Sequence, residues 1–419
     1  MKRYNNYHKH SHISSLFGGV GDSNIKQKEY IDRCLELGHT NFFTTEHGVF
    51  GDVFEAFDLC KNNNLRCLPG LEGYIVVDNN PELKDKSNYH IMIIPITDKA
   101  RKKCNYYNSL AHIQGFYYKP RWSLEYLLQF DKDDLYITTA CCAGLLHDEH
   151  SIEDILMPLI NHFGDHILLE VQNHQFDLQR DINKKAIILS ESTGLKLCAA
   201  NDSHYIYPWQ AKERHDLMVG KRQLEGKTDA IFVAEDEFIL DFPDYDTFFE
   251  RFDKQGVLSE QQIEEAIDNT LIFDNIEEIQ LDYEIKMPNI YPDIPLNDRM
   301  KMLENMIWEK FEETKQKEHI SEEDLPRYID GINYELQIIK DTNEQIHTCD
   351  YFLFNNRNVD LAVNKYGGIL TRGGRGSCAS FYTNKLLGMT QLDRFKINLP
   401  IFPDRFASTA RLIENRALP

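Results

Sequence analysis

Residue types that bind metal ions recur through the first half of the sequence. His8, His10 and His12 alternate near the N-terminus, so on an extended segment all three would point to one face. Other such residues lie at the ends of apolar runs or, in the case of Glu72, within one: Glu46, His47, Glu72, His90, Cys141, Asp202 and His204. Alone, a surface histidine is usually solvated and Cys141 would be an ordinary strand residue. So many ligand types at strand ends together indicate a metal site.

The mixture of ligand types indicates which ions would bind and what they would do. Imidazoles, carboxylates and one thiolate suit Zn²⁺, Mn²⁺ or Fe²⁺ better than Mg²⁺ or Ca²⁺, which favour oxygen ligands. A cluster this rich could hold two or three ions, and paired ions clamp a phosphate and generate hydroxide at neutral pH. The pattern therefore predicts hydrolysis of phosphate esters.

A second candidate site is the segment 373–377, which reads Gly-Gly-Arg-Gly-Ser. It precedes a helix expected over 378–387, with Gly388 as its C-terminal cap. Glycines let the backbone approach an anion, amides at a helix start donate to it, and an arginine adds charge. A tight turn without a ligand would explain the same residues. However, residues 346–419 carry 10 Lys and Arg against 5 Asp and Glu, which favours a surface that handles phosphate.

The elements that must position these residues follow from the apolar runs. Strands are predicted over residues 40–45, 65–77, 89–96, 135–142, 166–171 and 195–200. Amphipathic stretches at 53–62, 100–112 and 179–193 predict helices between several of these strands. Such alternation predicts a mainly parallel α/β sheet or barrel, in which catalytic groups gather at the C-terminal ends of the strands.

Proline and charge patterns divide the chain in two. Ser259 begins a capping box and a helix, and Pro288, Pro292 and Pro295 mark a linker. Residues 297–345 are strongly helical in pattern. We expect a first domain over 1–285, with its core in 1–215, and a second over 286–419.

Composition excludes several classes of protein. No window approaches the roughly 18 apolar residues of a membrane span, and no apolar segment follows the N-terminus as in a secretion signal. The nine cysteines are irregularly spaced, which predicts reduced thiols and a cytoplasmic location. A net charge of −21 argues against nucleic acid covering the whole surface.

The N-terminal motifs resemble those of the PHP (polymerase and histidinol phosphatase) domain. The matching segments begin at His8, Thr45, Gly70, His90 and Asn201, the last reading Asn-Asp-Ser-His-Tyr. The resemblance implies a distorted (β/α)7 barrel with a centre of two or three Zn²⁺ or Mn²⁺ ions. The metal ligands it implies are His8, His10, Glu46, His47, Glu72, His90, Cys141, Asp202 and His204.

Two positions depart from the pattern of that family. Glu46 stands where an aspartate is usual, and Phe17-Gly18 stands where Asp-Gly is common, a position not expected to bind metal. With all nine ligand positions filled, the resemblance implies a metal-loaded domain and a 3′–5′ exonuclease activity. Many polymerase PHP domains have lost ligands and are purely structural, so that alternative stays open.

The C-terminal part is similar to the early palm of C-family replicative DNA polymerases, the bacterial polymerase III alpha type. The motifs begin at Asp350, Gly374, Leu387 and Asp404. The resemblance implies that Gly374, Arg375, Gly376 and Ser377 bind the triphosphate of an incoming nucleotide. Ser380-Phe381 stands where the family usually has a second Gly-Ser.

The catalytic carboxylates of that family follow in a Pro-Asp-x-Asp sequence, and this chain ends at Pro419, where its proline would stand. The chain would then hold no catalytic residue for polymerisation. Catalysis with Mg²⁺ would need a C-terminal polymerase polypeptide.

Together these patterns predict an α/β chain with a PHP barrel followed by a mixed α+β partial palm. The leading hypothesis is the N-terminal portion of a bacterial or phage DNA-directed DNA polymerase, a nucleotidyltransferase of DNA replication. Its expected partners are template-primer DNA, dNTP and other replisome subunits. The alternatives are a stand-alone metal-dependent phosphoesterase and a non-catalytic replisome module.

Overall fold

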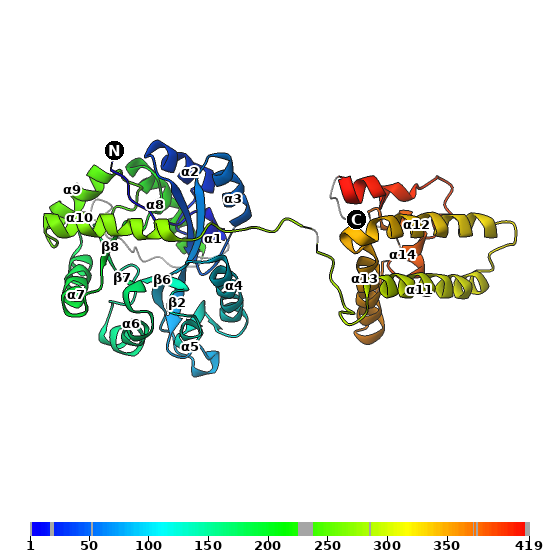
Figure 1. Cartoon of the computed structure of the whole chain (residues 1–419), viewed down its shortest axis with the longest axis horizontal. Coiled ribbons are helices and arrows are strands. Elements are labelled where there is room, and N and C mark those ends of the chain that lie inside the picture. Colours follow the sequence, from blue (N-terminus) through cyan, green and yellow to red (C-terminus); the bar gives the residue numbers. More distant parts are fainter. Residues whose placement is uncertain are drawn as a thin grey trace. The chain divides into compact units, whose positions relative to one another are not determined.

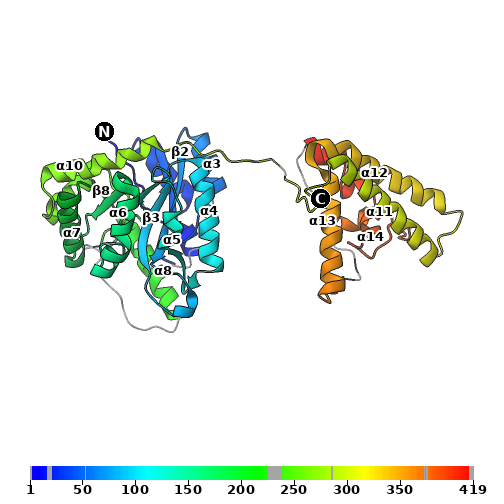
Figure 2. The same ribbon diagram turned by 60° about the horizontal axis from the view of Figure 1, so that its bottom comes forward.

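The computed structural model describes residues 2–16, 21–51, 53–224, 238–284, 286–371, 373 and 376–414. The chain divides into two compact units, Met1–Leu281 and Asp282–Pro419. Figures 1 and 2 show a sheet surrounded by helices in the first unit and a group of helices in the second. Each unit has its own hydrophobic core.

The sheet of the first unit contains all six strands that the apolar runs predict. These are β1 (Asn41–His47), β2 (Arg66–Val76), β3 (Tyr89–Pro95), β6 (Leu135–Thr138), β7 (Ile167–Gln172) and β8 (Leu197–Ala200). Two short strands that we did not predict, β4 (Phe116–Tyr117) and β5 (Lys119–Ser123), form a hairpin. The strand order is β4-β5-β2-β3-β6-β7-β8, and β1 also pairs with β2.

The sheet is mixed, and the expectation of a mainly parallel sheet needs one correction. Strand β3 is antiparallel to both β2 and β6, whereas β1, β5 and the β6-β7-β8 series pair in parallel. Because β3 runs backwards, its first residues lie beside the end of β2, with His90 opposite Tyr74. His90 thus reaches the rim where β1 and β2 end.

An extended segment near the N-terminus lies between β1 and the residues after β8. Lys9 forms a parallel bridge with Ser203, and the His10 amide donates to the Ser203 carbonyl oxygen at 2.7 Å. On the other side, the Thr45 hydroxyl donates to the Tyr7 carbonyl oxygen at 2.8 Å. The curled sheet therefore holds His8 and His10 between its first and last long strands.

Helices cover the outside of this sheet. They are α1 (His12–Leu16), α2 (Gln27–Glu36), α3 (Val53–Asn62), α4 (Asp98–Ile113), α5 (Leu124–Leu128), α6 (Met157–Phe163), α7 (Asp177–Thr193), α8 (Ala211–Leu224), α9 (Tyr245–Gln255) and α10 (Glu260–Asp268). The predicted capping box starts α10, where Ser259 accepts from the Gln262 amide. None of the described helices has the length and apolar character that crossing a membrane requires.

Among its described residues the second unit contains helices joined by turns and loops. Its helices are α11 (Leu296–Lys317), α12 (Leu325–Ile346), α13 (Thr348–Asp360) and α14 (Tyr382–Leu386). Buried residues recur at helical spacing, for example Leu303, Ile307 and Phe311 in α11. Helix faces therefore build this core, and the described part of 282–419 contains no strand, so the expected β component of a mixed α+β unit is not found there.

The glycine-rich segment is only partly described. Gly374 and Arg375 lie outside the described residues, as does Pro419. Gly376 has a φ of +64° in a turn, and the helix expected over 378–387 is divided by Phe381, whose backbone is extended. Gly388, with a φ of +81°, follows α14 as predicted. The nucleotide-binding role of Gly376 and Ser377 stays a prediction.

Candidate metal centre

Eight of the nine predicted ligands meet at one rim of the sheet. His8 and His10 come from the extended segment, Glu72 lies within β2, and the others follow or lie near strand ends: His47, His90, Cys141, Asp202 and His204. We call these eight residues, together with Asp22, the metal cluster. All but His90 and Cys141 belong to the buried residues of the chain.

Glu72 lies at the middle of the metal cluster. One carboxylate oxygen lies 3.4 Å from His8 Nε2 and 2.8 Å from His90 Nδ1. The other lies 3.2 Å from His10 Nε2 and 2.6 Å from His47 Nδ1. Cys141 Sγ lies 3.4 Å from His90 Nδ1 and completes this side.

Asp202 is the second carboxylate that several histidines of the metal cluster contact. Its Oδ1 lies 3.2 Å from Nε2 of His8 and 3.2 Å from Nε2 of His10, and 3.5 Å from Nδ1 of His204. Asp202 has a φ of +51°, a left-handed conformation that non-glycine residues seldom adopt. Such strained backbone is typical of functional sites.

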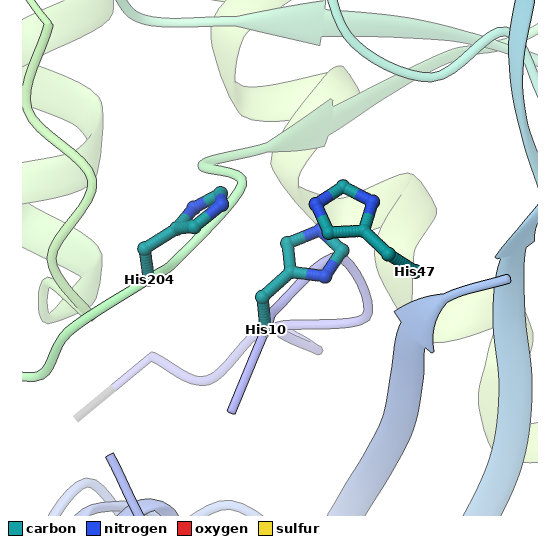
Figure 3. Close-up of side chains that lie close together, drawn as sticks. All are labelled: His10, His47 and His204. Carbon is teal, nitrogen blue, oxygen red and sulfur yellow. The ribbon is translucent and has the colours of Figure 1, made fainter. Parts of the chain in front are cut away.

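Three imidazoles form a third group, which Figure 3 shows. The rings of His10 and His47 stack with centroids 3.9 Å apart, and the ring of His204 lies 4.7 Å from that of His10. One nitrogen from each of the three rings lies within 4.8 Å of the others. Nitrogen atoms this close suit a shared metal ion.

Asp22 belongs to the metal cluster although no sequence pattern predicted it. Its carboxylate lies 2.9 Å from His204 Nε2 and 3.4 Å from His47 Nε2, and the residue is buried. It comes from the segment before α2, which has no strand pattern. The only sequence signal is an acidic residue after Gly21, close to the departure at Phe17-Gly18.

Glu46 has a different place from the one that we predicted. Its two oxygens accept hydrogen bonds from Lys9 Nζ, the amide and hydroxyl of Ser11, the Ser14 hydroxyl and Gln27 Nε2, at 2.6–3.2 Å. Successive residues of a strand point to opposite faces, so Glu46 and His47 cannot both face the rim. Glu46 supports the segment of His8 and His10, and we withdraw it as a ligand.

Polar residues next to the metal cluster orient its imidazoles. His8 Nδ1 lies 2.7 Å from Glu170, which also accepts from Tyr7, Thr138 and Gln172. His10 Nδ1 lies 3.1 Å from the Ser14 hydroxyl. These contacts leave Nε2 of both histidines directed toward Glu72 and Asp202. Partners of this kind are usual behind metal-binding histidines, and Glu170 and Ser14 had no distinguishing sequence pattern.

Several buried atoms of the metal cluster make no well-aligned hydrogen bond among the described residues, although most of them lie within 2.6–3.4 Å of one another as imidazole–carboxylate contacts. They are His8 Nε2, His10 Nε2, Asp22 Oδ1, His47 Nδ1, Glu72 Oε2 and Asp202 Oδ1. Buried polar atoms are normally held by well-formed hydrogen bonds, and one cluster rarely holds so many that are not. All six are nitrogen or oxygen atoms that coordinate metals, so the donor set fits bound cations.

The charges of the metal cluster depend strongly on one another. Burial would raise the pKa of the Glu72 carboxyl, but His90, His47 and His8 hold that pKa well below its ordinary value. Burial likewise lowers the pKa of His47, yet Glu72 and Asp22 raise it to about 10. Imidazole protons therefore balance the carboxylates, and a bound cation would replace those protons.

Comparisons with known proteins agree with the two units. Residues 6–174 match the PHP domain family, and residues 301–413 match the family described as the bacterial DNA polymerase III alpha NTPase domain. A DNA polymerase III subunit alpha from Aquifex aeolicus is 24% identical over 412 residues, which cover 92% of this chain and 34% of the relative. The same subunit from Borreliella burgdorferi is 24% identical, and the match covers 98% of this chain and 34% of the relative.

Among solved structures, an amidohydrolase from Chromobacterium violaceum is similar with 15% identity and a TM-score of 0.32, over 48% of this chain and 88% of that chain. This chain spans about a third of the length of the polymerase subunits named above. It carries a PHP domain and a polymerase III alpha NTPase segment, and over most of its length it is homologous to the N-terminal region of DNA polymerase III alpha subunits.

Proposed function

We propose that the first unit is a metal-dependent phosphodiesterase that removes nucleotides from the 3′ end of DNA. The observation that carries this proposal is the group of six buried nitrogen and oxygen atoms of the metal cluster that converge without a well-aligned hydrogen bond among the described residues. A purely structural role would favour paired or apolar groups in their place. Homology to DNA polymerase III alpha subunits supports DNA as the substrate.

The arrangement provides for two or three ions, Zn²⁺ or Mn²⁺. Three overlapping groups of residues could each hold an ion: His10, His47 and His204; His8, His10 and Glu72; and His47, Glu72 and His90. Because one imidazole nitrogen binds one ion, the ions would divide these residues among themselves. Asp22, Asp202 and Cys141 lie beside these groups and would complete or bridge them. Ions bound there would polarise a phosphate and supply hydroxide at neutral pH.

The chain's own residues prepare this chemistry. Glu170 and Ser14 fix the rings of His8 and His10, so that each directs Nε2 to the cluster. Burial excludes water from the carboxylates and strengthens their attraction for cations. Deprotonation of the imidazoles accompanies ion binding, so we expect affinity to fall as the pH is lowered.

We further propose that the second unit is the beginning of a polymerase palm. In a complete polymerase it would contribute to a site for template-primer DNA, dNTP and Mg²⁺, together with a C-terminal polypeptide and other replisome subunits in the cytoplasm. Homology of residues 301–413 supports this role. The domain limits, 1–285 and 286–419, are part of the same proposal.

Metal analysis combined with hydrolysis of a 3′-labelled single strand tests the nuclease. Purified full chain should contain two or three equivalents of Zn²⁺ or Mn²⁺ and shorten the strand. We expect His10→Ala and Asp202→Asn to lose metal and to reduce the rate at least 100-fold, because each contacts more than one histidine or carboxylate of the cluster.

His12→Ala is the matched control. His12 alternates with His8 and His10 in the sequence, but its Nδ1 lies 3.3 Å from the Ile25 carbonyl oxygen, outside the metal cluster. The control should keep both metal and activity. Unchanged rates in His10→Ala would reveal a contaminating nuclease, and bound metal without hydrolysis would favour a structural PHP domain.

A further inference from the structure

The β4–β5 hairpin lies beside the metal cluster. Strand β5 pairs in parallel with the end of β2, where Arg121 is opposite Tyr74. Lys119 and Glu72 each precede that pair by two residues, so they lie at the same level of the sheet. Lys119 Nζ also donates to the Tyr74 hydroxyl at 3.3 Å, and the Tyr74 ring meets the edge of the His90 ring with their centres 5.2 Å apart. The hairpin therefore extends the rim on which the metal cluster lies.

A second contact joins the hairpin to the strand that carries His47. A methyl group placed on Gly48 would lie 2.9 Å from Pro120 Cγ, so the hairpin packs against the residue that follows His47. The end of α4 packs there too, because Asn108 Nδ2 and His112 Nε2 lie 3.2 Å and 2.8 Å from the Gly48 carbonyl oxygen. The hairpin and the turn that connects it to α4 thus stand at one edge of the metal cluster.

Large apolar side chains project from this edge into solvent. Ile113 is 78% exposed, Phe116 53% and Tyr118 70%, and such a group of exposed apolar residues is typical of a binding surface. Tyr118 is the single residue between β4 and β5, and its φ of +60° is an outlier for a bulky side chain. Glycine would avoid this strain, and an exposed ring adds little to the core. The strained backbone therefore points to a role for the Tyr118 ring in binding.

Buried hydrogen bonds hold the hairpin in a fixed position. The Arg121 guanidinium donates to the carbonyl oxygens of Asp85 at 2.7 Å and Asn79 at 3.4 Å. In return, Asn79 Nδ2 donates to the Arg121 carbonyl oxygen at 2.9 Å. Gly115 permits this close approach, since a methyl group there would lie 2.5 Å from the same carbonyl oxygen. A surface that is already rigid loses less entropy when a ligand binds to it.

The charge around the exposed rings is positive in a strongly acidic chain. Residues 99–124 contain six Lys and Arg and no Asp or Glu, whereas the whole chain has a net charge of −21. Lys86, from the segment before β3, places its Nζ 5.7 Å from the centre of the Tyr118 ring. Lys119 follows Tyr118 directly. Aromatic rings beside cations suit single-stranded nucleic acid, whose bases stack on the rings while the cations attract its phosphates.

We propose that Phe116 and Tyr118 stack on bases of a DNA single strand whose 3′ end enters the metal cluster, and that Lys86 and Lys119 bind its phosphates. This inference rests on the proposed phosphodiesterase function and names the surface that would hold the substrate. Because Lys119 contacts Tyr74 at the rim, it would meet a phosphate close to the ions. Lys86 would meet a phosphate farther from the 3′ end.

Binding of a phosphorothioate thymidine oligonucleotide, which resists hydrolysis, to the manganese-loaded full chain tests the proposal. Fluorescence anisotropy should show that Tyr118→Gly weakens binding about tenfold, equivalent to roughly 1.4 kcal/mol. This variant also relieves the strained φ, so its melting temperature should not fall. Tyr118→Phe keeps the ring and should bind as the unsubstituted chain does. Phe116→Ala should weaken binding by a factor similar to that of Tyr118→Gly.

The lysines and a matched aromatic control complete the test. Lys86→Met and Lys119→Met should each reduce the slope of log affinity against log salt concentration by about 0.7, because each removes one phosphate contact. Tyr106→Ala is the control. Tyr106 is 60% exposed but lies two positions before Asn108, which places it on the opposite side of α4 from the contact with Gly48. This variant should keep its affinity, and metal content should be the same in every variant.

The outcomes distinguish this proposal from the proposed function. Equal affinity in Tyr118→Gly, Phe116→Ala and the unsubstituted chain would overturn it. Equally strong competition by a blunt duplex would overturn it too, since the bases of a duplex are already stacked on one another. Ring-dependent binding without hydrolysis of an unmodified single strand would support the hairpin surface and contradict the nuclease. Hydrolysis that is unchanged in both ring variants would support the nuclease and overturn the hairpin as its DNA-binding surface.

Discussion

Glu46 and Lys9 form a buried ion pair beneath the metal cluster. Lys9 Nζ lies 3.1 Å from Glu46 Oε1, and both side chains are almost entirely inaccessible to solvent. Burial would raise the pKa of Glu46, but Lys9 and His10 hold it at about 2. The Glu46 carboxylate is therefore ionised, and hydrogen bonds occupy both of its oxygens. The residue type of Glu46 and its place near the end of a predicted strand could not reveal these hydrogen bonds. Their donors, Lys9, Ser11, Ser14 and Gln27, lie far from Glu46 in the sequence.

His39 makes the stability of the first unit depend on pH. It is buried between Tyr4 and Phe242, its Nδ1 has no hydrogen-bond partner among the described residues, and burial lowers its pKa to about 4. The unfolded pKa is about 6.5. The folded state thus binds this proton less well, so the stability present above about pH 6.5 is lost as the pH falls toward 4.

We expect His39 to contribute a loss of about 3 kcal/mol in the free energy of unfolding across that range. His39→Phe retains the ring packing and should remove this loss. Urea unfolding of the chelator-treated chain at pH 7 and pH 4.5 measures it. An identical pH dependence in the variant and the unsubstituted chain would contradict the assignment.

At the scale of elements, the long strands were predictable and their directions were not. Six apolar runs predicted six strands because buried strands contain continuous apolar residues. Apolar content does not encode direction, so the reversal of β3 was missed although it places His90 at the rim.

The β4–β5 hairpin was missed because its strands are short, and Pro120 and charged residues interrupt the pattern. Asp22 precedes α2 in a segment without periodicity, so it was missed too.

Gly144 shows how a turn holds Cys141 beside His90. The Gly144 amide donates to the Cys141 carbonyl oxygen at 2.8 Å, and Gly144 forms a bridge with His90. A methyl group on Gly144 would overlap the Thr139 carbonyl oxygen and lie 2.9 Å from that of Cys141. Because these are backbone atoms, the turn itself would have to move.

Gly144→Ala should therefore reduce the free energy of unfolding by about 1–3 kcal/mol and lower the bound metal. Gly220→Ala is the control, since Gly220 lies in α8 with nothing within 4 Å of the added methyl group. Thermal unfolding and metal analysis of both variants provide the comparison. Equal metal content and equal melting temperatures would show that the turn does not position Cys141.

At the scale of the whole molecule, the two units rely on different interactions. The first has a sheet core and a buried metal cluster, whereas the second has a helical core that includes Phe311, Ile332 and Phe352. The second unit also contains a buried ion pair: Arg299 Nε lies 2.6 Å from Asp350 Oδ1, and Nη2 lies 2.9 Å from Oδ2. The helical pattern predicted over residues 297–345 is confirmed by α11 and α12, whereas α13 was not predicted. The described residues of the second unit contain no strand, and the expectation of a β component there came from resemblance and not from the spacing of its apolar residues.

Because only the first unit holds the metal cluster, removing metal should destabilise that unit alone. Calorimetry of the full chain should show two transitions. Chelation should reduce the free energy of unfolding for one transition by about 3 kcal/mol, if the free ion concentration had been near 100 times the dissociation constant. Phe311→Ala opens a cavity in the helical core and should reduce the free energy of unfolding for the other transition by about 3–5 kcal/mol. If chelation and Phe311→Ala shift the same transition, the units unfold together and their stabilities are coupled; separate shifts would show that the metal supports only the sheet that binds it.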